Sequence, residues 1–317
     1  MAAWIDRGAP TPKSNFAICY LLFVISFELK ARMTMHDFDL IASPLLVGAF
    51  AVLVWFQWHH PLRSQHFHGL RRTIRNLLLS LPAFLIARLA LLPLPLALAI
   101  FTERYHFGLL HWLPLPNWLA GIVGILLLDY VYWWWHFGLH RVPFLWRFHN
   151  VHHTDLDMDV STAARFHFGE MIFSVFLFLV ALPLIGISPS MFVVFWVLFE
   201  VSVQFQHSNW RLPVTLERIL NRVLVTPRMH GIHHSIVERE TNSNWGTVFV
   251  WWDWIHGTLR RDVPQNAITI GVPAYRDEKE LTIGQLLVLP FRNQRPWRLP
   301  NGEIPDRPAQ RADELAP

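Results

Sequence analysis

Residues 118–153 read WLAGIVGILLLDYVYWWWHFGLHRVPFLWRFHNVHH, an apolar, tryptophan-rich run that passes directly into a segment with five histidines. The first half, residues 118–135, approaches the length of about 20 residues that a helix needs to cross a hydrocarbon core. The second half, residues 136–153, is polar and rich in imidazole. The stretch therefore predicts a membrane helix whose end presents several histidines at the membrane surface.

The composition of the whole chain agrees with a membrane protein. Of its 317 residues, 53% are apolar, and they include 16 Trp and 24 Phe, which is too apolar for an ordinary soluble domain. The net charge is only +4, and the basic residues are scattered between apolar runs, so nucleic acid is not expected as a partner. The single cysteine, Cys19, cannot supply a thiolate cluster. Any bound metal must be held by nitrogen or oxygen.

Three further apolar runs are long enough to span a membrane, at residues 40–58, 77–101 and 171–206. The last is too long for one crossing and contains LIGISPS, in which Gly186, Ser188, Pro189 and Ser190 favour a turn, so it predicts a helical hairpin. An earlier run, FAICYLLFVISF, is only twelve residues long and is expected to be interfacial or signal-like. We therefore expect an all-α, polytopic fold with five crossings and a cytoplasmic, histidine-rich cap that holds a dimetal site.

Basic residues orient the crossings, because loops on the cytoplasmic side of a membrane are enriched in Lys and Arg. Arg63, Arg71, Arg72 and Arg75 follow the first span, and Arg141, Arg147 and Arg165 follow the third, whereas the hairpin tip has none. The histidine-rich loop and the tail are therefore both expected in the cytoplasm. The predicted regions are an N-terminal segment (1–39), three transmembrane helices (40–135), a cytoplasmic histidine region (136–170), the hairpin (171–206), a second cytoplasmic histidine region (207–262) and a cytoplasmic tail (263–317).

The histidines fall into three boxes with repeated spacing. The first box is HxxxH (His136 and His140), the loop box is HxxHH (His149, His152 and His153), and the distal box is a second HxxHH (His230, His233 and His234). On a helix, residues three and four apart share a face, so each box can direct imidazoles at one point. Adjacent histidines diverge by about 100° around a helix, which lets one segment serve two metal ions.

Eight imidazoles are twice what one tetrahedral zinc ion accepts, so two metals fit the count better than one. A lone histidine would more often be an interfacial side chain than a ligand. Three clusters on one side of a membrane favour metal binding instead. The histidines near the first span, His59, His60, His66 and His68, lack this order and are expected to be interfacial, while His106 and His111 are expected on the opposite side.

Helical periodicity adds candidates outside the boxes. Asp129 shares a face with His136 and His140 and is expected to orient one of them by accepting an N–H bond, or else to face another helix. Glu200, Gln204 and His207 likewise share a face, and His207 is expected to be a ninth ligand. His167 and Glu170 are equally compatible with supporting the ligands and with a purely structural role. The expected metal ligands are therefore His136, His140, His149, His152, His153, His207, His230, His233 and His234.

These motifs resemble the fatty acid hydroxylase superfamily, often called the sterol desaturase family. The pattern HxxxH, HxxHH, distal HxxHH is carried by DYVYWWWHFGLHRVPFLWRFHNVHH and TPRMHGIHHS, and QFQHSNWRLP and NSNWGTVFVWWDWIHGT resemble two further family segments. The second of these adds Asn244 and Asp253 as candidate supporting residues. His256 departs from the family, whose members more often have an apolar or aromatic residue there, and it is not expected to be a ligand.

The resemblance implies a non-haem di-iron enzyme that uses O2 to hydroxylate a membrane lipid, such as an acyl chain or a sterol. A lipid desaturase with the same site is the first alternative, and a metal-binding or transport protein without enzymatic activity is the second. Zinc has no redox chemistry, which favours iron. The sequence has no CxxC motif and no GxGxxG motif, so electrons are expected from an external donor of the cytochrome b5, ferredoxin or reductase type.

Overall fold

The computed structural model describes residues 35–65 and 69–307, so most of the N-terminal segment predicted over residues 1–39 lies outside it. Within the described part of the chain, every regular element is a helix, and the only β-type pairings are isolated bridges. The predicted all-α fold is therefore confirmed.

Five helical stretches are long and apolar enough to cross a membrane, which makes the chain a multi-pass membrane protein. They are formed by α2 (Met35–His59), by α3 (Gly69–Ile86) continuing through η1 (Ala87–Leu91), α4 (Pro93–Tyr105) and α5 (Leu109–Trp112), by α6 (Asn117–Arg141), by α8 (Phe168–Ile185) and by α9 (Pro189–His207). Large apolar side chains on these helices are exposed, as expected of surfaces that face lipid: Leu89, for example, is 68% exposed.

The second stretch is longer than the predicted 77–101 span. It covers residues 69–112, which would be about 66 Å of continuous helix, or twice the thickness of a hydrocarbon core. Its axis is interrupted at η1, where the Leu92 N–H bonds to the Ala87 carbonyl five residues back, immediately before Pro93. The first turns of α3 extend beyond the apolar layer, and there Arg72 and Asn76 are fully buried against polar segments.

The predicted hairpin is formed by α8 and α9. Gly186 ends α8 with φ of +71°, and the Ser188 hydroxyl accepts a hydrogen bond from the Met191 N–H at the start of α9. A side chain at Gly186 would lie 2.7 Å from the Phe107 carbonyl oxygen, so the turn packs tightly against the segment before α5. Only glycine fits both the backbone angle and the space.

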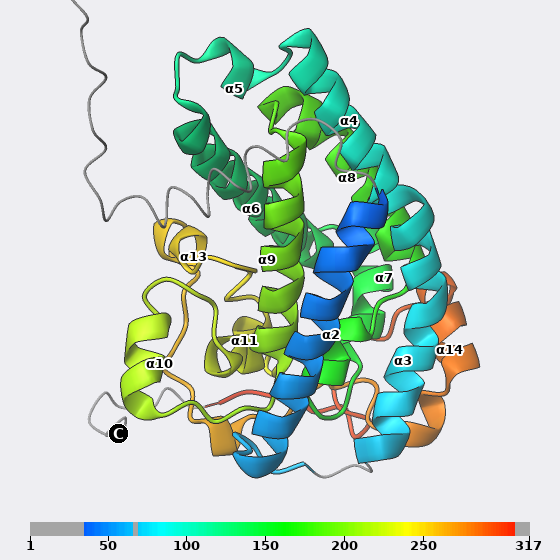
Figure 1. The fold of residues 1–317 in the computed structure, drawn as a ribbon. Coiled ribbons are helices and arrows are strands. Elements are labelled where there is room, and N and C mark those ends of the chain that lie inside the picture. Colours follow the sequence, from blue (N-terminus) through cyan, green and yellow to red (C-terminus); the bar gives the residue numbers. More distant parts are fainter. Residues whose placement is uncertain (1–34, 66–68, 308–317) are drawn as a thin grey trace, which may run out of the picture.

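The remaining elements gather at the opposite end of the bundle from this turn (Figure 1). They are α7 (Pro143–His153), η2 (Val160–Ala164), α10 (Val214–Leu220), α11 (Pro227–His233), α12 (Glu238–Thr241), α13 (Trp251–Ile255), η3 (Gln265–Ala267), η4 (Glu278–Glu280), α14 (Ile283–Val288) and η5 (Leu289–Phe291). Backbone bonds from Leu62 to Asn209 and from Arg211 to His60 join the ends of α2 and α9 there.

Candidate metal centre

Nine buried or half-buried histidines converge where α6, α7, α9 and α11 meet. They form two groups, and within each group one nitrogen from every member lies within 4.8 Å of the others. The five-histidine group contains His136, His140, His149, His153 and His233, and the four-histidine group contains His152, His207, His230 and His234. These are the nine histidines expected from the sequence, and the structure brings all of them together.

Adjacent histidines separate between the two groups, as the helical angle predicts. His153 belongs to the five-histidine group and His152 to the four-histidine group, and His233 and His234 divide in the same way. Helices α7 and α11 therefore contribute to both groups. Helix α6 contributes only to the first group and α9 only to the second. His136 and His140 lie on the last turns of α6, which continues without a break to Arg141.

Backbone carbonyls fix the orientation of four rings. The Nδ1–H groups of His136, His152, His207 and His233 donate to the carbonyl oxygens of Trp245, Arg165, Val203 and Ser243, over 2.9, 3.3, 2.7 and 2.8 Å. A carbonyl can only accept, so Nδ1 carries the proton and Nε2 of each neutral ring keeps its lone pair. These Nε2 atoms are the ones available as ligands.

The spacing of nitrogens in the four-histidine group is that of ligands around one ion. His207 Nε2 lies 3.0 Å from His152 Nε2 and 2.9 Å from His230 Nε2, and His234 Nε2 lies 3.2 Å from His230 Nε2. Since the Nδ1 atoms of His207 and His152 already carry protons, two lone pairs face each other across 3.0 Å. That arrangement is repulsive unless a cation lies between them.

The five-histidine group shows the same need through unpaired atoms. Buried Nε2 atoms of His140, His149, His153 and His233 have no hydrogen-bond partner among the described residues. A buried polar atom without a partner costs about 1–3 kcal/mol, and four at one point would be a large penalty. A metal ion with nitrogen ligands satisfies all of them, so the residues present fit two ions.

The electrostatic environment keeps these rings available for metal. Burial, followed by the neighbouring imidazoles, holds the pKa of His152, His153, His230 and His234 well below the usual value. Burial also lowers the pKa of His233 to about 3. The rings are therefore neutral at physiological pH, which is the protonation state that binds metal.

Glu170 contacts a histidine directly. Its Oε1 lies 3.1 Å from His149 Nδ1, and both side chains are buried, so the carboxylate accepts the ring N–H and leaves Nε2 for metal. A carboxylate in this position fixes the tautomer and the orientation of the ring. His167, its neighbour, has a structural role instead: its Nδ1 accepts from the Gly169 N–H at the start of α8 and its Nε2–H donates to the Leu287 carbonyl.

Of the two roles expected for Asp129, the structure does not show a hydrogen bond to His136 or His140. The two oxygens of Asp129 accept the N–H groups of Val248 and Phe249 and the indole N–H of Trp252. Residues 248–252 pack against α6 and supply these donors. Helical periodicity describes one helix at a time, so it cannot reveal such a contact. Asp129 therefore anchors that segment to α6.

Asp253 and Asn244 also support the site through the backbone rather than through histidine side chains. Asp253 accepts the N–H groups of Trp245 and Gly246, and Trp245 presents the carbonyl that receives His136. Asn244 adopts φ of +53° and donates to the Met229 and Arg260 carbonyls, which fixes the chain beside His230.

A buried ionic network supports the loop box and was missed by the sequence analysis. Arg165 donates to the Val151 carbonyl, Thr154 and Asn76, and its own carbonyl receives His152. Asp155, with its pKa lowered mainly by Arg72 against the effect of burial, also bonds to Arg72 at 2.8 Å. In the sequence, Arg72 and Arg165 are interpreted only as basic residues that orient the membrane crossings. Their complete burial depends on pairing across the fold.

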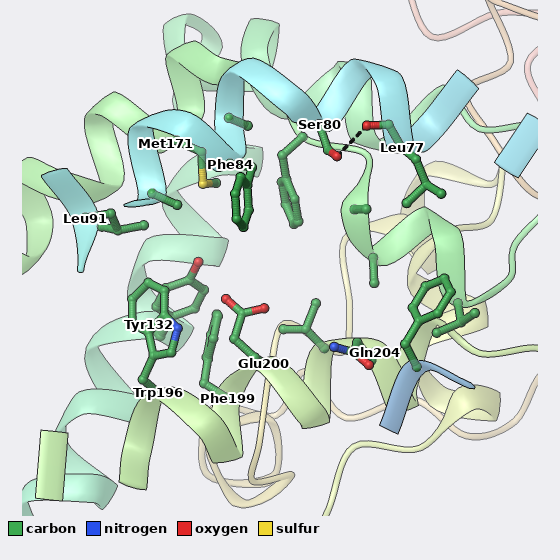
Figure 2. A pocket seen from close by; sticks show the side chains of 18 of the residues that line it. Leu77, Ser80, Phe84, Leu91, Tyr132, Met171, Trp196, Phe199, Glu200 and Gln204 are labelled. Carbon is green, nitrogen blue, oxygen red and sulfur yellow. Dashed lines mark hydrogen bonds between the residues drawn. The ribbon is translucent and has the colours of Figure 1, made fainter. Parts of the chain in front are cut away.

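Glu200 and Gln204 share a face with His207 but make no hydrogen bond to a histidine within the described residues. They line a cavity of about 260 Å³ between α9, α3 and α8, together with mostly apolar side chains (Figure 2). Phe166, also in the lining, stacks on the His152 ring at 4.9 Å between centroids. The cavity therefore adjoins the four-histidine group.

The other histidines lie outside both groups. His59 and His60 are exposed at the end of α2, and His106 and His111 lie near the hairpin turn, at the far end of the bundle. His256 stacks on Trp133 and bonds to the Tyr130 hydroxyl, so it is not part of either group. His66 and His68 lie outside the described residues.

The chain is similar in sequence to several curated proteins. The chain is 27% identical to an alkylglycerol monooxygenase of Danio rerio over 81% of its own length and 55% of that protein. It is 28% identical to an ornithine lipid hydroxylase of Rhizobium tropici over 53% of its length and 49% of that protein. A very-long-chain aldehyde decarbonylase of Oryza sativa is 26% identical over 52% of the chain and 62% of that protein.

The chain thus spans about half the length of the curated relatives that it matches first. No solved structure matches it at a significant level. Residues 121–258 match the family model described as fatty acid hydroxylase, and this region contains all nine clustered histidines as well as Asp129, Glu170 and Asp253. Over this region, the chain resembles the fatty acid hydroxylase family.

Proposed function

We propose that this protein is a membrane-bound oxidoreductase that hydroxylates a lipid with O2, using a non-haem di-iron centre and electrons from an external donor. The observation that carries the proposal is the pair of buried histidine groups, whose converging and otherwise unpaired ring nitrogens fit two metal ions. The lipid-related names of the matched relatives and the membrane-spanning helices point to a lipid substrate.

The nine histidines would hold the two ions, five around one and four around the other. Iron bound there would supply the redox chemistry with O2 that protein side chains cannot provide. In a hydroxylation, one oxygen atom enters the C–H bond and the other leaves as water, which requires two electrons and two protons from outside the substrate. A cytochrome b5, ferredoxin or reductase-type partner would supply the electrons at the cytoplasmic face.

The residues of the chain prepare this centre in three ways. Backbone carbonyls and Glu170 hold protons at Nδ1, so Nε2 faces the ions without rotation of the ring. The apolar cavity beside His152 offers a dry site for a hydrocarbon chain. Its contact with the four-histidine group through Phe166 would place a carbon of that chain near the metals.

Lipid mass spectrometry of a host with and without the expressed protein tests the proposal. We expect new lipids that have gained one oxygen atom. New lipids that have instead lost two hydrogen atoms would make the protein a desaturase. An unchanged lipid profile, with iron bound and an electron donor supplied, would contradict an enzymatic role and favour the metal-binding or transport alternative.

A further inference from the structure

The cavity beside the four-histidine group has an uneven lining. Most of its surface is apolar and comes from side chains on α3, α8 and α9, among them Phe84, Met171 and Phe199. Glu200 points from α9 into this apolar space, beside Tyr132 (Figure 2). A carboxylate is therefore exposed to the cavity within the membrane-spanning part of the bundle.

Glu200 and Gln204, which line one wall of this cavity, have no polar partners among the described residues. No described residue makes a hydrogen bond or an ion pair with Glu200, and the buried Oε1 of Gln204 has no partner either. The nearby Tyr132 hydroxyl is already bonded to Ser174. Ionisable groups inside membrane helices are costly and usually face a functional path, so unpaired oxygens here point to a ligand that supplies hydrogen-bond donors.

The position of Glu200 fixes how such a ligand lies. Glu200 and Gln204 are seven and three residues before His207 on α9, so Glu200 lies about 10 Å along the helix axis from His207. Phe166 closes the cavity next to His152. A lipid that meets Glu200 with a polar group and the histidines with a carbon must keep the two well apart along its length.

We propose that Glu200 is the specificity-determining residue of this cavity, and that it selects lipids carrying a hydrogen-bond donor, a hydroxyl or an amine, at a distance from the carbon that reacts. The carboxyl group of Glu200 has no polar partner in the described part of the chain and offers oxygen acceptors to a donor on the ligand. Lipids that present a carboxylate or phosphate at this depth bring no such donor and are disfavoured. The proposal rests on the proposed function for the ligand being a substrate.

Binding of matched probes to the purified full-length protein tests this assignment. Four radiolabelled probes of one chain length are compared: an alcohol, an amine, the alkane and the fatty acid. Because the alcohol and the amine give the otherwise unpaired Glu200 a hydrogen bond, wild-type protein is expected to bind them at least about tenfold more tightly than the alkane. In Glu200→Leu both ratios should fall to near one, with alkane binding unchanged.

Two further variants sharpen the test. Glu200→Gln keeps the shape and one acceptor oxygen, so it should retain most of the alcohol preference and lose the amine preference. Glu103→Gln, on the exposed far end of α4, should behave as wild type. Bound metal, measured in every variant, reports whether the histidine groups have formed.

Preferences that survive in Glu200→Leu would overturn the proposal, as would a wild-type protein that binds all four probes equally. If the leucine variant does not fold, an unchanged amine preference in Glu200→Gln overturns it. Probe binding can be measured without lipid oxidation, so the proposed function and the role of Glu200 are tested separately. Intact donor preference without lipid oxidation contradicts only the proposed function, and oxidation with a preference independent of Glu200 contradicts only the present assignment.

Discussion

Each imidazole in the two groups uses its two nitrogens differently. In His136, His152, His207 and His233, one nitrogen donates to a backbone carbonyl, and the other points towards the centre of a group. The ring is thereby held in one tautomer before any metal arrives. This division of tasks makes single substitutions informative, because the two functions of a ring can be removed separately.

Replacing His207 by alanine should remove one ligand of the four-histidine group only. We expect wild-type protein, reconstituted with iron under anaerobic conditions, to approach two iron atoms per chain. The iron content of His207→Ala should fall towards one atom per chain, and its activity should be lost. No other described histidine can replace His207 beside His152, His230 and His234. His59→Ala, on an exposed ring, is the control and should retain both ions. A wild-type content near one with full activity would contradict the two-ion centre.

Removing the carboxylate behind His149 should weaken metal binding without removing a ligand. We expect Glu170→Ala to reduce iron affinity or activity by about 10–100 fold, and Glu170→Gln to lose less because its amide oxygen still accepts the ring N–H. Competition with a metal chelator measures the affinity. Glu303→Ala, on the surface, is the matched control. Equal affinity in Glu170→Ala and wild type would show that the contact is incidental.

At the residue scale, the sequence predicts the nine histidines and the division of His152 from His153, because box spacing and helix geometry are local properties. It does not predict the partners of those rings. The Trp245 carbonyl that receives His136, and Arg72, which pairs with Asp155, are brought in by folding over long sequence separations. Local periodicity carries no information about such contacts.

At the scale of elements, Asp129 joins α6 to the segment that leads into α13. Asp129→Ala leaves one buried donor and two partly buried donors without an acceptor, and a buried one costs about 1–3 kcal/mol. We therefore expect a lower unfolding temperature in detergent, with two iron atoms still bound by the folded fraction. Asp262→Ala, at a surface position, should unfold as wild type does. Loss of iron with unchanged stability would instead support a direct role beside the histidines.

The hairpin turn gives a second test at this scale. Gly186→Ala introduces a side chain at φ of +71° and within 2.7 Å of a carbonyl oxygen, so we expect a loss of about 1–3 kcal/mol in stability. Gly284→Ala, in α14, has open space around it and should be neutral or slightly stabilising. Unfolding curves of the two variants in the same detergent measure the difference. Equal curves would mean that the turn adapts at no cost.

The elements themselves are largely predictable here, since long apolar runs and turn residues specify membrane helices directly. The five crossings and the turn at Gly186 and Ser188 follow from the sequence. The extension of the second stretch to residues 69–112 does not, because the polar start of α3 is stabilised by Asp155 and Asp159 rather than by its own apolarity. Short helices such as α11 and α13 depend on tertiary packing in the same way.

At the scale of the whole molecule, the basic residues predict that the histidine end faces the cytoplasm. A reporter fused after Pro317 should therefore have cytoplasmic activity, and one inserted in the loop at residues 113–116 should lie across the membrane. Exposed Arg71 supports this orientation, whereas fully buried Arg72 serves the fold instead. A reporter at Pro317 that is active only on the non-cytoplasmic side would contradict this orientation. Electrons would then have to arrive from that side.

The spread of ligands over α6, α7, α9 and α11 also sets the order of biosynthesis. Each group includes at least one histidine of the distal box (His230, His233 and His234). Neither group can therefore be complete until the ribosome has made this part of the chain. By then all five membrane helices have been synthesised. Metal insertion is therefore a late step of biosynthesis, and a chain that stalls before His234 carries neither group complete. A metal ion that meets the chain earlier finds at most a partial set of ligands.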